Sequence, residues 1–356
     1  MIDLGGAAPR IGVFRALVLG DMLCATPALR TLRAAWPQAE ITLIGLPWAE
    51  ALVDRLPSLD RFIAFPGHAG LPERAADEAA WPAFVDELRS HRFDLLLQMH
   101  GSGGITNPLV AGWGARHCAG FAEPGAWRPE PQLFAPWPVR GHEIERLLAL
   151  TDRLGLARQG LYLDFPLRDD ERGAVAARWP GPNVCLHPGA QLASRRWRPE
   201  RFAAIGDLLA SRGYEVLITG TAGEAAIANE VAAAMHAPSQ VLAGQTTLWT
   251  LGALIERSAL LVCNDTGVSH IAAALHTPSV VVSLGAEVSR WAPLDRQRHR
   301  VLWEPVACRP CAHAVCPVGH GCSTGLELRR VADAVLQVLD TAPARVRQPE
   351  TAQAAY

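Results

Sequence analysis

The sequence predicts an α/β protein made of two doubly wound domains, each a mainly parallel sheet covered by helices. Short β-rich runs alternate with longer helical stretches along the whole chain. This alternation is interrupted at Pro180-Gly181-Pro182, a strong structural break, and then starts again. The chain has 356 residues, which is too long for one ordinary hydrophobic core and sufficient for two.

The expected elements follow from periodicity and from turn residues. In the first half, we expect strands at 11–19, 40–45, 61–64, 93–98 and 117–120, and helices at 26–35, 47–56, 81–90 and 141–154. Segment 125–140 is rich in Pro and Trp and lacks a clear period, so we expect a loop there. In the second half, we expect strands at 183–187, 215–219, near 241, 260–263 and 279–283, and helices at 168–179, 199–212, 222–235, 247–257, 269–275 and 326–339. These elements divide the chain into an N-terminal domain (1–165), a C-terminal domain (166–325), a closing helix (326–342) and a polar tail (343–356).

Composition narrows the class of protein. Apolar residues make up 49% of the chain and the formal net charge is −2, with both signs mixed, so we expect a globular protein that does not bind nucleic acid. All the basic residues are arginines, so any cation that meets a phosphate must be Arg. No run approaches the roughly 20 apolar residues of a membrane span. The N-terminus lacks the basic and then apolar pattern of a secretory signal, which predicts a cytoplasmic protein.

Gly20 and Asp21 stand at the turn between the first predicted strand and the next helix. Pro27 falls near the expected start of that helix, where its missing N–H does no harm. Asp21 or Thr26 could cap the helix. Alternatively, Asp21 is a carboxylate at the ligand-binding edge of the sheet that takes a proton from an attacking hydroxyl. Local chemistry alone favours the cap.

Two further strand-end loops carry residues suited to a nucleotide. Gly189 and Ala190 follow a buried strand and precede Arg195 and Arg196; glycine lets backbone amides approach an anion, and Arg offers bidentate contacts to phosphate. A solvated loop with surface arginines is the alternative.

The third loop, Asn264-Asp265-Thr266-Gly267, leads into a helix whose N-terminus suits a diphosphate. Asp265 and Thr266 could instead cap that helix. His270 lies about one turn further on, which favours a site, and Glu224 in another strand-end loop could accept hydrogen bonds from ribose hydroxyls.

Taken together and in this order, these segments resemble the ADP-heptose:lipopolysaccharide heptosyltransferase family, glycosyltransferase family 9. The resemblance covers about residues 11–339 and implies the GT-B architecture, two Rossmann-like domains facing across a cleft. The segments that carry it are Gly20-Asp21 with Thr26-Pro27-Ala28-Leu29, Gly101-Ser102-Gly103 with Asn107-Pro108, His187-Pro188-Gly189-Ala190 with Arg196-Trp197 and Pro199, and Asn264-Asp265-Thr266-Gly267 with Ser269-His270 and Ala273-Ala274.

The resemblance assigns roles to these residues. Asp21 matches the family's proposed catalytic base, which raises the catalytic interpretation above the cap. Arg195 stands two residues before Trp197, where family members often carry a Lys that meets the donor phosphates. The implied substrate-binding set is Gly20, Thr26, Gly189, Ala190, Arg195, Arg196, Glu224, Thr246, Asp265, Thr266, Gly267 and His270, with Glu224 and Thr246 near the ribose and base.

The implied reaction is inverting transfer of a heptose or related sugar from an ADP-sugar to a lipopolysaccharide-core or similar glycan acceptor, lipid-linked or free. No metal or other cofactor is implied for catalysis. A lipid-linked acceptor implies transient, peripheral contact with the inner face of the cytoplasmic membrane. Four arginines in the N-terminal half could meet an anionic acceptor: Arg74, Arg116, Arg128 and Arg140.

Three other functions use related folds. A nucleotide-sugar epimerase would need further acid–base residues around the sugar. A catalytically silent nucleotide-sugar-binding protein would not need Asp21. A nicotinamide dehydrogenase ranks low because neither first-strand turn reads G-x-G-x-x-G.

Cysteines cluster near the C-terminus with the spacing C-x2-C-x4-C-x5-C, at Cys308, Cys311, Cys316 and Cys322. Four thiolates at such spacing can hold a structural zinc or iron–sulfur group. The second half of the cluster lacks the tight C-x2-C repeat of a typical zinc module. A structural metal, a disulfide pair and reduced thiols all stay open. The remaining cysteines lie in or beside predicted strands or the first-strand turn and are expected in the core.

Overall fold

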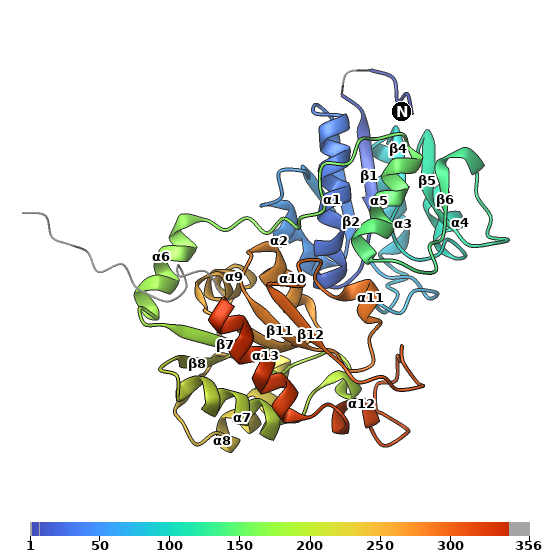
Figure 1. Cartoon of the computed structure of the whole chain (residues 1–356). Coiled ribbons are helices and arrows are strands. Elements are labelled where there is room, and N and C mark those ends of the chain that lie inside the picture. Colours follow the sequence, from blue (N-terminus) through green and yellow to red (C-terminus); the bar gives the residue numbers. More distant parts are fainter. Residues whose placement is uncertain (1, 7, 342–356) are drawn as a thin grey trace, which may run out of the picture. The chain divides into compact units, whose positions relative to one another are not determined.

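The computed structural model describes residues 2–6 and 8–341 of the chain (Figure 1). The chain divides into two compact units, with the boundary between Pro166 and Leu167. Each unit contains a six-stranded sheet in which every strand pairs parallel to its neighbours. Across the described residues, we find no helix that is both long and apolar enough to cross a membrane.

The first unit has the strand order β3-β2-β1-β4-β5-β6. Its strands are β1 (Arg10–Phe14), β2 (Glu40–Gly45), β3 (Arg61–Ala64), β4 (Leu95–Gln98), β5 (His117–Ala122) and β6 (Phe134–Pro136). Its helices are α1 (Leu19–Ala35), η1 (Pro47–Ala49), α2 (Glu50–Val53), α3 (Trp81–Ser90), α4 (Thr106–Ala111), η2 (Pro131–Leu133) and α5 (Glu143–Arg153). Strands β1, β2 and β4 are almost entirely buried, as expected for central strands covered on both faces.

The second unit repeats this arrangement with the order β12-β11-β10-β7-β8-β9. Its strands are β7 (Asn183–His187), β8 (Glu215–Ile218), β9 (Ser239–Val241), β10 (Leu261–Asn264), β11 (Ser279–Val282) and β12 (His299–Leu302). Its helices are α6 (Asp169–Arg178), η3 (Ala193–Arg195), α7 (Pro199–Ala210), η4 (Ala222–Glu224), α8 (Ala225–Ala234), α9 (Leu248–Arg257), α10 (Gly267–Ala274), α11 (Val288–Trp291), α12 (Gly321–Thr324) and α13 (Leu328–Thr341).

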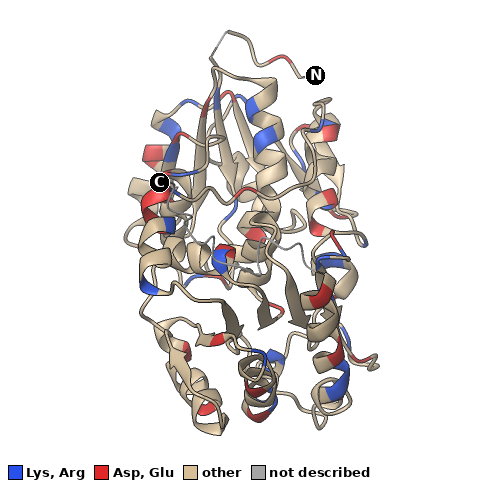
Figure 2. Ribbon diagram, turned by 60° about the vertical axis from the view of Figure 1, so that its left-hand side comes forward, with Lys and Arg blue, Asp and Glu red and all other residues tan. Residues whose placement is uncertain are grey.

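Helix α13 belongs to the core of the second unit. Its buried residues Val331, Val335 and Val338 join the same hydrophobic cluster as Val184 of β7 and Val280 of β11. Acidic and basic residues are interspersed over the helices and loops of both units, while the strands are largely uncharged (Figure 2). The charge pattern therefore largely follows burial, and the buried charged residues Arg15, Glu143 and Arg146 are the exceptions.

Both sheets have a switch point where the order of the strands reverses. In the first unit it lies between β1 and β4, and in the second between β7 and β10. Ligands of open α/β sheets bind beyond the carboxyl ends of the strands at such points. The loops after these four strands are therefore the candidate ligand-binding loops.

The first strand and helix differ from the sequence-based expectation. Strand β1 ends at Phe14, and α1 begins at Leu19 rather than at residue 26. The helix cap is Val18, so neither Asp21 nor Thr26 is a cap residue. Apolar residues at 16–19 fit a strand and a buried helix equally well, which is why periodicity alone misplaced this boundary.

Several short elements were also missed. The expected loop 125–140 contains η2 and β6, and the second sheet has an additional edge strand, β12. Strand β6 is only three residues long and ends in Pro136, which a strand tolerates at an edge. Helices α4, α11 and α12 have six or four residues, too few to show a period. The predicted polar tail (343–356) lies outside the described residues.

Candidate active site

Arg15 is the central side chain at the switch point of the first unit. It follows β1 and is buried, with 2% of its surface exposed. Its Nε donates to the carbonyl oxygen of Asp21 at 3.0 Å, and its Nη1 donates to that of Met99, after β4, at 2.6 Å. Its Nη2 lies 3.3 Å from Oε1 of the buried Glu143 in α5. One guanidinium thus joins the ends of β1 and β4 to the first turns of α1 and α5.

The Asp21 carboxylate stands at this same edge, in the first turn of α1. Its Oδ1 is 3.7 Å from Nη2 of Arg15, and its side chain is 20% exposed. A nearby cation favours the charged form of a carboxylate. A partly exposed carboxylate at a helix N-terminus is chemically suited to accept a proton from a bound hydroxyl.

His100 completes the buried polar group on the β4 side. Its ring stacks on Phe14 at a centroid distance of 4.9 Å, and its Nδ1 accepts a hydrogen bond from the Ala16 N–H at 3.2 Å. Burial, and next the charge of Arg15, lower the pKa of His100 to about 4. The imidazole is therefore neutral at pH 7, and its Nε2, 3.5 Å from Glu73, carries the proton.

Asn264 joins the two sides of the switch point in the second unit. Its Nδ2 donates to the carbonyl oxygen of Pro188 at 2.7 Å, and its Oδ1 accepts from the backbone N–H of Trp197 at 3.0 Å. These bonds hold the loop after β7 against the end of β10. Arg196 closes the same loop because its Nε donates to the carbonyl oxygen of Ala190 at 2.8 Å. Arg196 is half-buried, so this bond ties its side chain to its own loop.

Glu224 packs directly against the Gly189 backbone. A Cβ atom at Gly189 would lie 2.2 Å from Oε1 of Glu224, so only glycine allows this approach. The other carboxylate oxygen, Oε2, accepts from the backbone N–H of Thr221 at 2.8 Å and lies 3.8 Å from Nε2 of His187. Burial lowers the pKa of His187 and the charge of Glu224 opposes that effect. The loops after β7 and β8 thus meet where the Glu224 carboxylate lies against the Gly189 backbone.

Asp265 and Thr266 form the turn from β10 into α10. Oδ2 of Asp265 accepts a hydrogen bond from Ser283 Oγ at 3.2 Å, so its side chain is directed to the loop after β11 and does not cap the helix. Burial raises the pKa of Asp265, while the Ser283 hydrogen bond and the charges of Arg195 and Arg309 oppose the rise. The N–H groups of the first turn of a helix have no partner within the helix, so this turn offers donors to an anion.

The remaining predicted residues of the second unit lie around this turn. Gly267 is the first residue of α10, and His270 is buried one turn later, with its ring 6.4 Å from that of Trp291. Arg195 is half-buried, and its Nη2 donates to the carbonyl oxygen of Cys311 at 3.1 Å. Thr246 is half-buried in the loop after β9, the edge strand of this sheet.

Two residues proposed from sequence do not reach the candidate site. Thr26 is fully buried; its Oγ1 donates to the carbonyl oxygen of Leu23 and accepts from the Asp164 N–H. Arg116 precedes β5, at the amino end of the strand, and its Nη1 donates to the carbonyl oxygen of Leu4. Thr26 therefore serves the fold, and Arg116 lies at the sheet edge opposite to Asp21.

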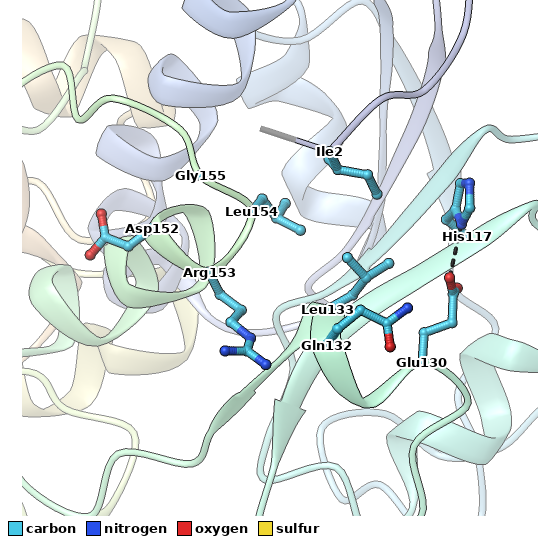
Figure 3. A pocket seen from close by; sticks show the side chains of 9 residues that line it. All are labelled: Ile2, His117, Glu130, Gln132, Leu133, Asp152, Arg153, Leu154 and Gly155. Carbon is cyan, nitrogen blue, oxygen red and sulfur yellow. Dashed lines mark hydrogen bonds and ion pairs between the residues drawn. The ribbon is translucent and has the colours of Figure 1, made fainter.

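A pocket of about 440 Å³ lies at that opposite edge of the first unit (Figure 3). Ile2, Leu133 and Leu154 point toward one another in it, and His117 at the start of β5 forms a hydrogen bond of 2.9 Å with Glu130. Because it borders the amino end of β5, this pocket is separate from the switch-point site.

Sequence reasoning missed Arg15, His100, Ser283 and Arg309. Arg15 is the one for which a signal was present, because an arginine inside an otherwise apolar run must be paired when buried. The other three become recognisable only from contacts between segments distant in the chain.

The cysteines are all free thiols. Cys24, Cys118, Cys185 and Cys263 are buried, as predicted, and the disulfide alternative for the C-terminal cluster is not formed. In the described part of the chain, no group of three or more His, Cys, Asp or Glu side chains is arranged to hold a metal ion.

Two Rossmann-type units, each with its polar residues at the carboxyl edge of the switch point, are the domain pair of GT-B glycosyltransferases. The family model "Glycosyltransferase family 9 (heptosyltransferase)" matches residues 81–321. The chain belongs to this family and is a glycosyltransferase, as the sequence motifs predict.

Individual relatives agree with this assignment. The chain is 28% identical over 291 residues to lipopolysaccharide heptosyltransferase 2 of Escherichia coli K12, covering 74% of this chain and 79% of the relative. Its fold is similar to that of a family 9 glycosyl transferase from Veillonella parvula, with a TM-score of 0.77 at 18% identity over 96% and 99% of the two chains. It is also similar to E. coli ADP-heptose lps heptosyltransferase II, with a TM-score of 0.73 at 22% identity over 93% and 98%.

Proposed function

We propose that this glycosyltransferase transfers a heptose or a closely related sugar from an ADP-sugar to a lipopolysaccharide-core glycan, with inversion at the anomeric carbon. The observation that carries the proposal is the turn from β10 into α10. At this helix N-terminus, the positive charges of Arg195 and Arg309 both act on the Asp265 carboxyl group. A heptosyltransferase 2 among the relatives and an ADP-heptose enzyme among the similar folds support the choice of donor and acceptor.

The donor is assigned to the second unit. The diphosphate would take the amide groups at Thr266 and Gly267 and the charge of Arg195, and the sugar would lie near Asp265 and His270. Glu224 would accept hydrogen bonds from the ribose, with Thr246 near the base. The packing of Glu224 against Gly189 supports this placement, because it puts a carboxylate beside the loop after β7.

The base is assigned to the first unit. Asp21 would take the proton of the acceptor hydroxyl as the hydroxyl oxygen bonds to the anomeric carbon. The bond from that carbon to the diphosphate oxygen breaks on the opposite face, and ADP leaves with the electron pair. Arg195 and the N-terminus of α10 would stabilise the charge that develops on ADP, so the step needs no metal or other cofactor.

The acceptor is proposed to be lipid-linked or free core glycan bound by the first unit. Nη1 of Arg74 donates to the carbonyl oxygen of Phe65 at 2.9 Å. Phe65 directly follows β3, so this contact lies at the same carboxyl edge of the sheet as Asp21. Arg74 therefore lies at the edge where an anionic core sugar would meet Asp21. Work on a lipid-linked acceptor would take the enzyme to the inner face of the cytoplasmic membrane.

The deciding experiment combines binding and transfer. Calorimetric titration of the full chain should show ADP binding more tightly than UDP or GDP. Asp21→Asn should lower the transfer rate about a hundred- to ten-thousandfold while leaving ADP affinity unchanged. The matched control is Asp54→Asn, an exposed aspartate after α2 in the same unit.

Each alternative gives a different result. Preference for UDP or GDP would contradict an ADP-sugar donor, and full activity of Asp21→Asn would remove Asp21 as the base. An epimerised nucleotide sugar in place of a new glycosidic bond would favour the epimerase. Retention of configuration in the product would exclude the inverting mechanism.

A structural metal on the C-terminal cysteines stays a prediction from their spacing. Element analysis of protein purified without chelators tests it. About one equivalent of zinc or iron, lost in Cys308→Ser and Cys322→Ser, would support the metal. Absence of metal from the wild-type protein would leave the thiols as reduced side chains.

A further inference from the structure

The cysteine-rich segment, residues 308–322, has no part in the proposed reaction. It follows β12 and leads into α12. Its side chains range from the exposed Cys308 to the buried Cys322. What the segment does can be inferred from its contacts, because it hydrogen-bonds to two loops at the carboxyl edge of the second sheet.

The first of these loops contains η3 and follows β7. The backbone N–H of Ser194 donates to the carbonyl oxygen of Ala314 at 3.0 Å, and the Ser194 carbonyl oxygen lies 2.7 Å from Nε2 of His320. Next to it, Arg195 donates to the carbonyl oxygen of Cys311 at 3.1 Å. The position of Arg195 therefore depends on the cysteine-rich segment.

The second loop, residues 283–286, follows β11. Cys311 donates its backbone N–H to the carbonyl oxygen of Gly285 at 2.8 Å. Nη2 of Arg309 donates to the carbonyl oxygen of Ser283 at 2.8 Å, and Nη1 donates to that of Ala286. In the sheet, β10 lies between β7 and β11, so these two loops flank the turn at Asp265.

Arg309 also reaches that turn through a side-chain relay. Its Nη1 lies 3.4 Å from Ser283 Oγ, and Ser283 Oγ donates to Oδ2 of Asp265 at 3.2 Å. The charges of Arg309 and Arg195 both act on the Asp265 carboxyl. Arg195 and Arg309 thus bring positive charge to the neighbourhood of this turn, which suits a diphosphate.

We propose that Arg309 is a positioning residue of the donor site, carried by the cysteine-rich segment, which braces the two loops beside Asp265 and thereby fixes Asp265 and Arg195 for a nucleoside diphosphate sugar. This inference rests on the proposed function for the assignment of the donor to the second unit. It gives the segment a role that does not require the cysteines to bind metal.

The test separates donor from acceptor. Arg309→Gln removes the charge and the bonds to both loop carbonyls. The expected result is an ADP dissociation constant and a donor KM at least about tenfold higher, with the acceptor KM unchanged. Arg309→Lys keeps the charge and should lie between Gln and wild type. The control is Arg329→Gln, an exposed arginine of α13 with a side chain 88% exposed, which should behave as wild type.

A second variant tests the brace without changing Arg309. His320 has a φ of 59°, a left-handed conformation that Asn tolerates well, and Asn is too short to reach Ser194. His320→Asn should weaken ADP binding in the same direction and leave the acceptor KM unchanged. It also keeps the inference testable if Arg309→Gln fails to fold.

The outcomes distinguish the two proposals. If the wild-type protein binds ADP and both Arg309→Gln and His320→Asn bind it equally well, the inference is wrong and the donor assignment stands. If donor and acceptor KM rise together, Arg309 supports only the general fold and the inference is also wrong. If the wild-type protein does not bind ADP, both proposals are removed.

Discussion

Arg15 shows how a single buried residue can organise the edge of a sheet. Its guanidinium contacts Asp21, Met99 and Glu143, which come from α1, from the end of β4 and from α5. Glu143 is itself buried and also lies 3.3 Å from Arg146. Removing one partner of a buried ion pair leaves an uncompensated charge, which costs far more than losing a surface pair.

We predict that Arg15→Met lowers the stability of the first unit by about 3–5 kcal/mol, because the buried Glu143 carboxylate loses the cation of Arg15. Chemical denaturation of the purified variants measures this. The control is Arg61→Met, which removes an exposed pair with Glu40 and should cost about 1 kcal/mol or less. Equal losses in the two variants would contradict the organising role of Arg15.

The second prediction at this scale concerns Gly189, whose missing Cβ makes room for the Glu224 carboxylate. Gly189→Ala should displace Glu224 and weaken ADP binding about tenfold or more. The carboxylate proposed to contact the ribose and the loop after β7 would both move. Gly223→Ala is the matched control, because a Cβ there meets only Thr221 Oγ1 at 3.9 Å. Calorimetry on both variants decides, and unchanged affinity in Gly189→Ala would argue against Glu224 as a donor ligand.

Helix α1 shows how an element tolerates a residue that ought to break it. Pro27 lies in its interior and has no N–H for the carbonyl oxygen of Leu23, four residues earlier. Thr26 Oγ1 donates to that oxygen at 2.8 Å and replaces the missing bond. The same Oγ1 accepts from the Asp164 N–H at 2.9 Å, which connects the C-terminal end of the first unit to α1.

Thr26→Val keeps the shape of the side chain and removes both hydrogen bonds. We predict a loss of about 1–3 kcal/mol, because two buried backbone groups lose their partner. For a unit of this size, thermal unfolding should shift down by roughly 2–4 °C per kcal/mol. Thr341→Val, at an exposed helical threonine of α13, should leave the melting temperature within about a degree. A Thr26→Val variant as stable as this control would show that Pro27 is accommodated without the hydroxyl.

Elements bounded by clear turn residues were predictable, and those defined by tertiary contacts were not. The strands at 40–45 and 183–187 and the helix at 81–90 are confirmed residue for residue, because apolar runs there end at Gly, Pro or polar positions. Asp21 and Asp265 could be proposed because they follow strands. Arg15 and Glu143 are 128 residues apart, and Arg309 and Ser283 are 26 apart, so no local pattern could pair them.

For the whole molecule, the proposal predicts that transfer does not depend on a divalent metal. Arg195, Arg309 and the N-terminus of α10 supply positive charge where ADP would depart. Activity measured with saturating donor and acceptor should be the same with EDTA as with added magnesium. A loss that magnesium restores would mean that the arginines do not supply the compensation alone.

Both units are also predicted to lose stability in mild acid through buried histidines: His100 in the first unit, and His187 and His299 in the second. Burial lowers the pKa of His100 in the first unit and of His299 in the second to about 4; for His299 it outweighs the opposing charge of Asp295. Ser279 Oγ lies 2.8 Å from Nδ1 of His299, in the pair that joins β11 to β12. Both pKa values lie below the usual value of 6.5, so each unfolded unit binds a proton that the folded unit rejects.

The contribution of each histidine is therefore unaffected above pH 6.5 and falls as the pH drops from 6.5 toward 4, by about 2 kcal/mol at pH 5. Denaturation at pH 7.5 and pH 5 should show this loss in the wild-type protein. His100→Gln and His299→Gln should each reduce the loss in their own unit, whereas His313→Gln, at an exposed position, should not. If the pH dependence stays the same in all three variants, acid sensitivity comes from paired carboxylates instead. Protonation of those carboxylates, and not of His100 and His299, would then set the stability of both units at low pH.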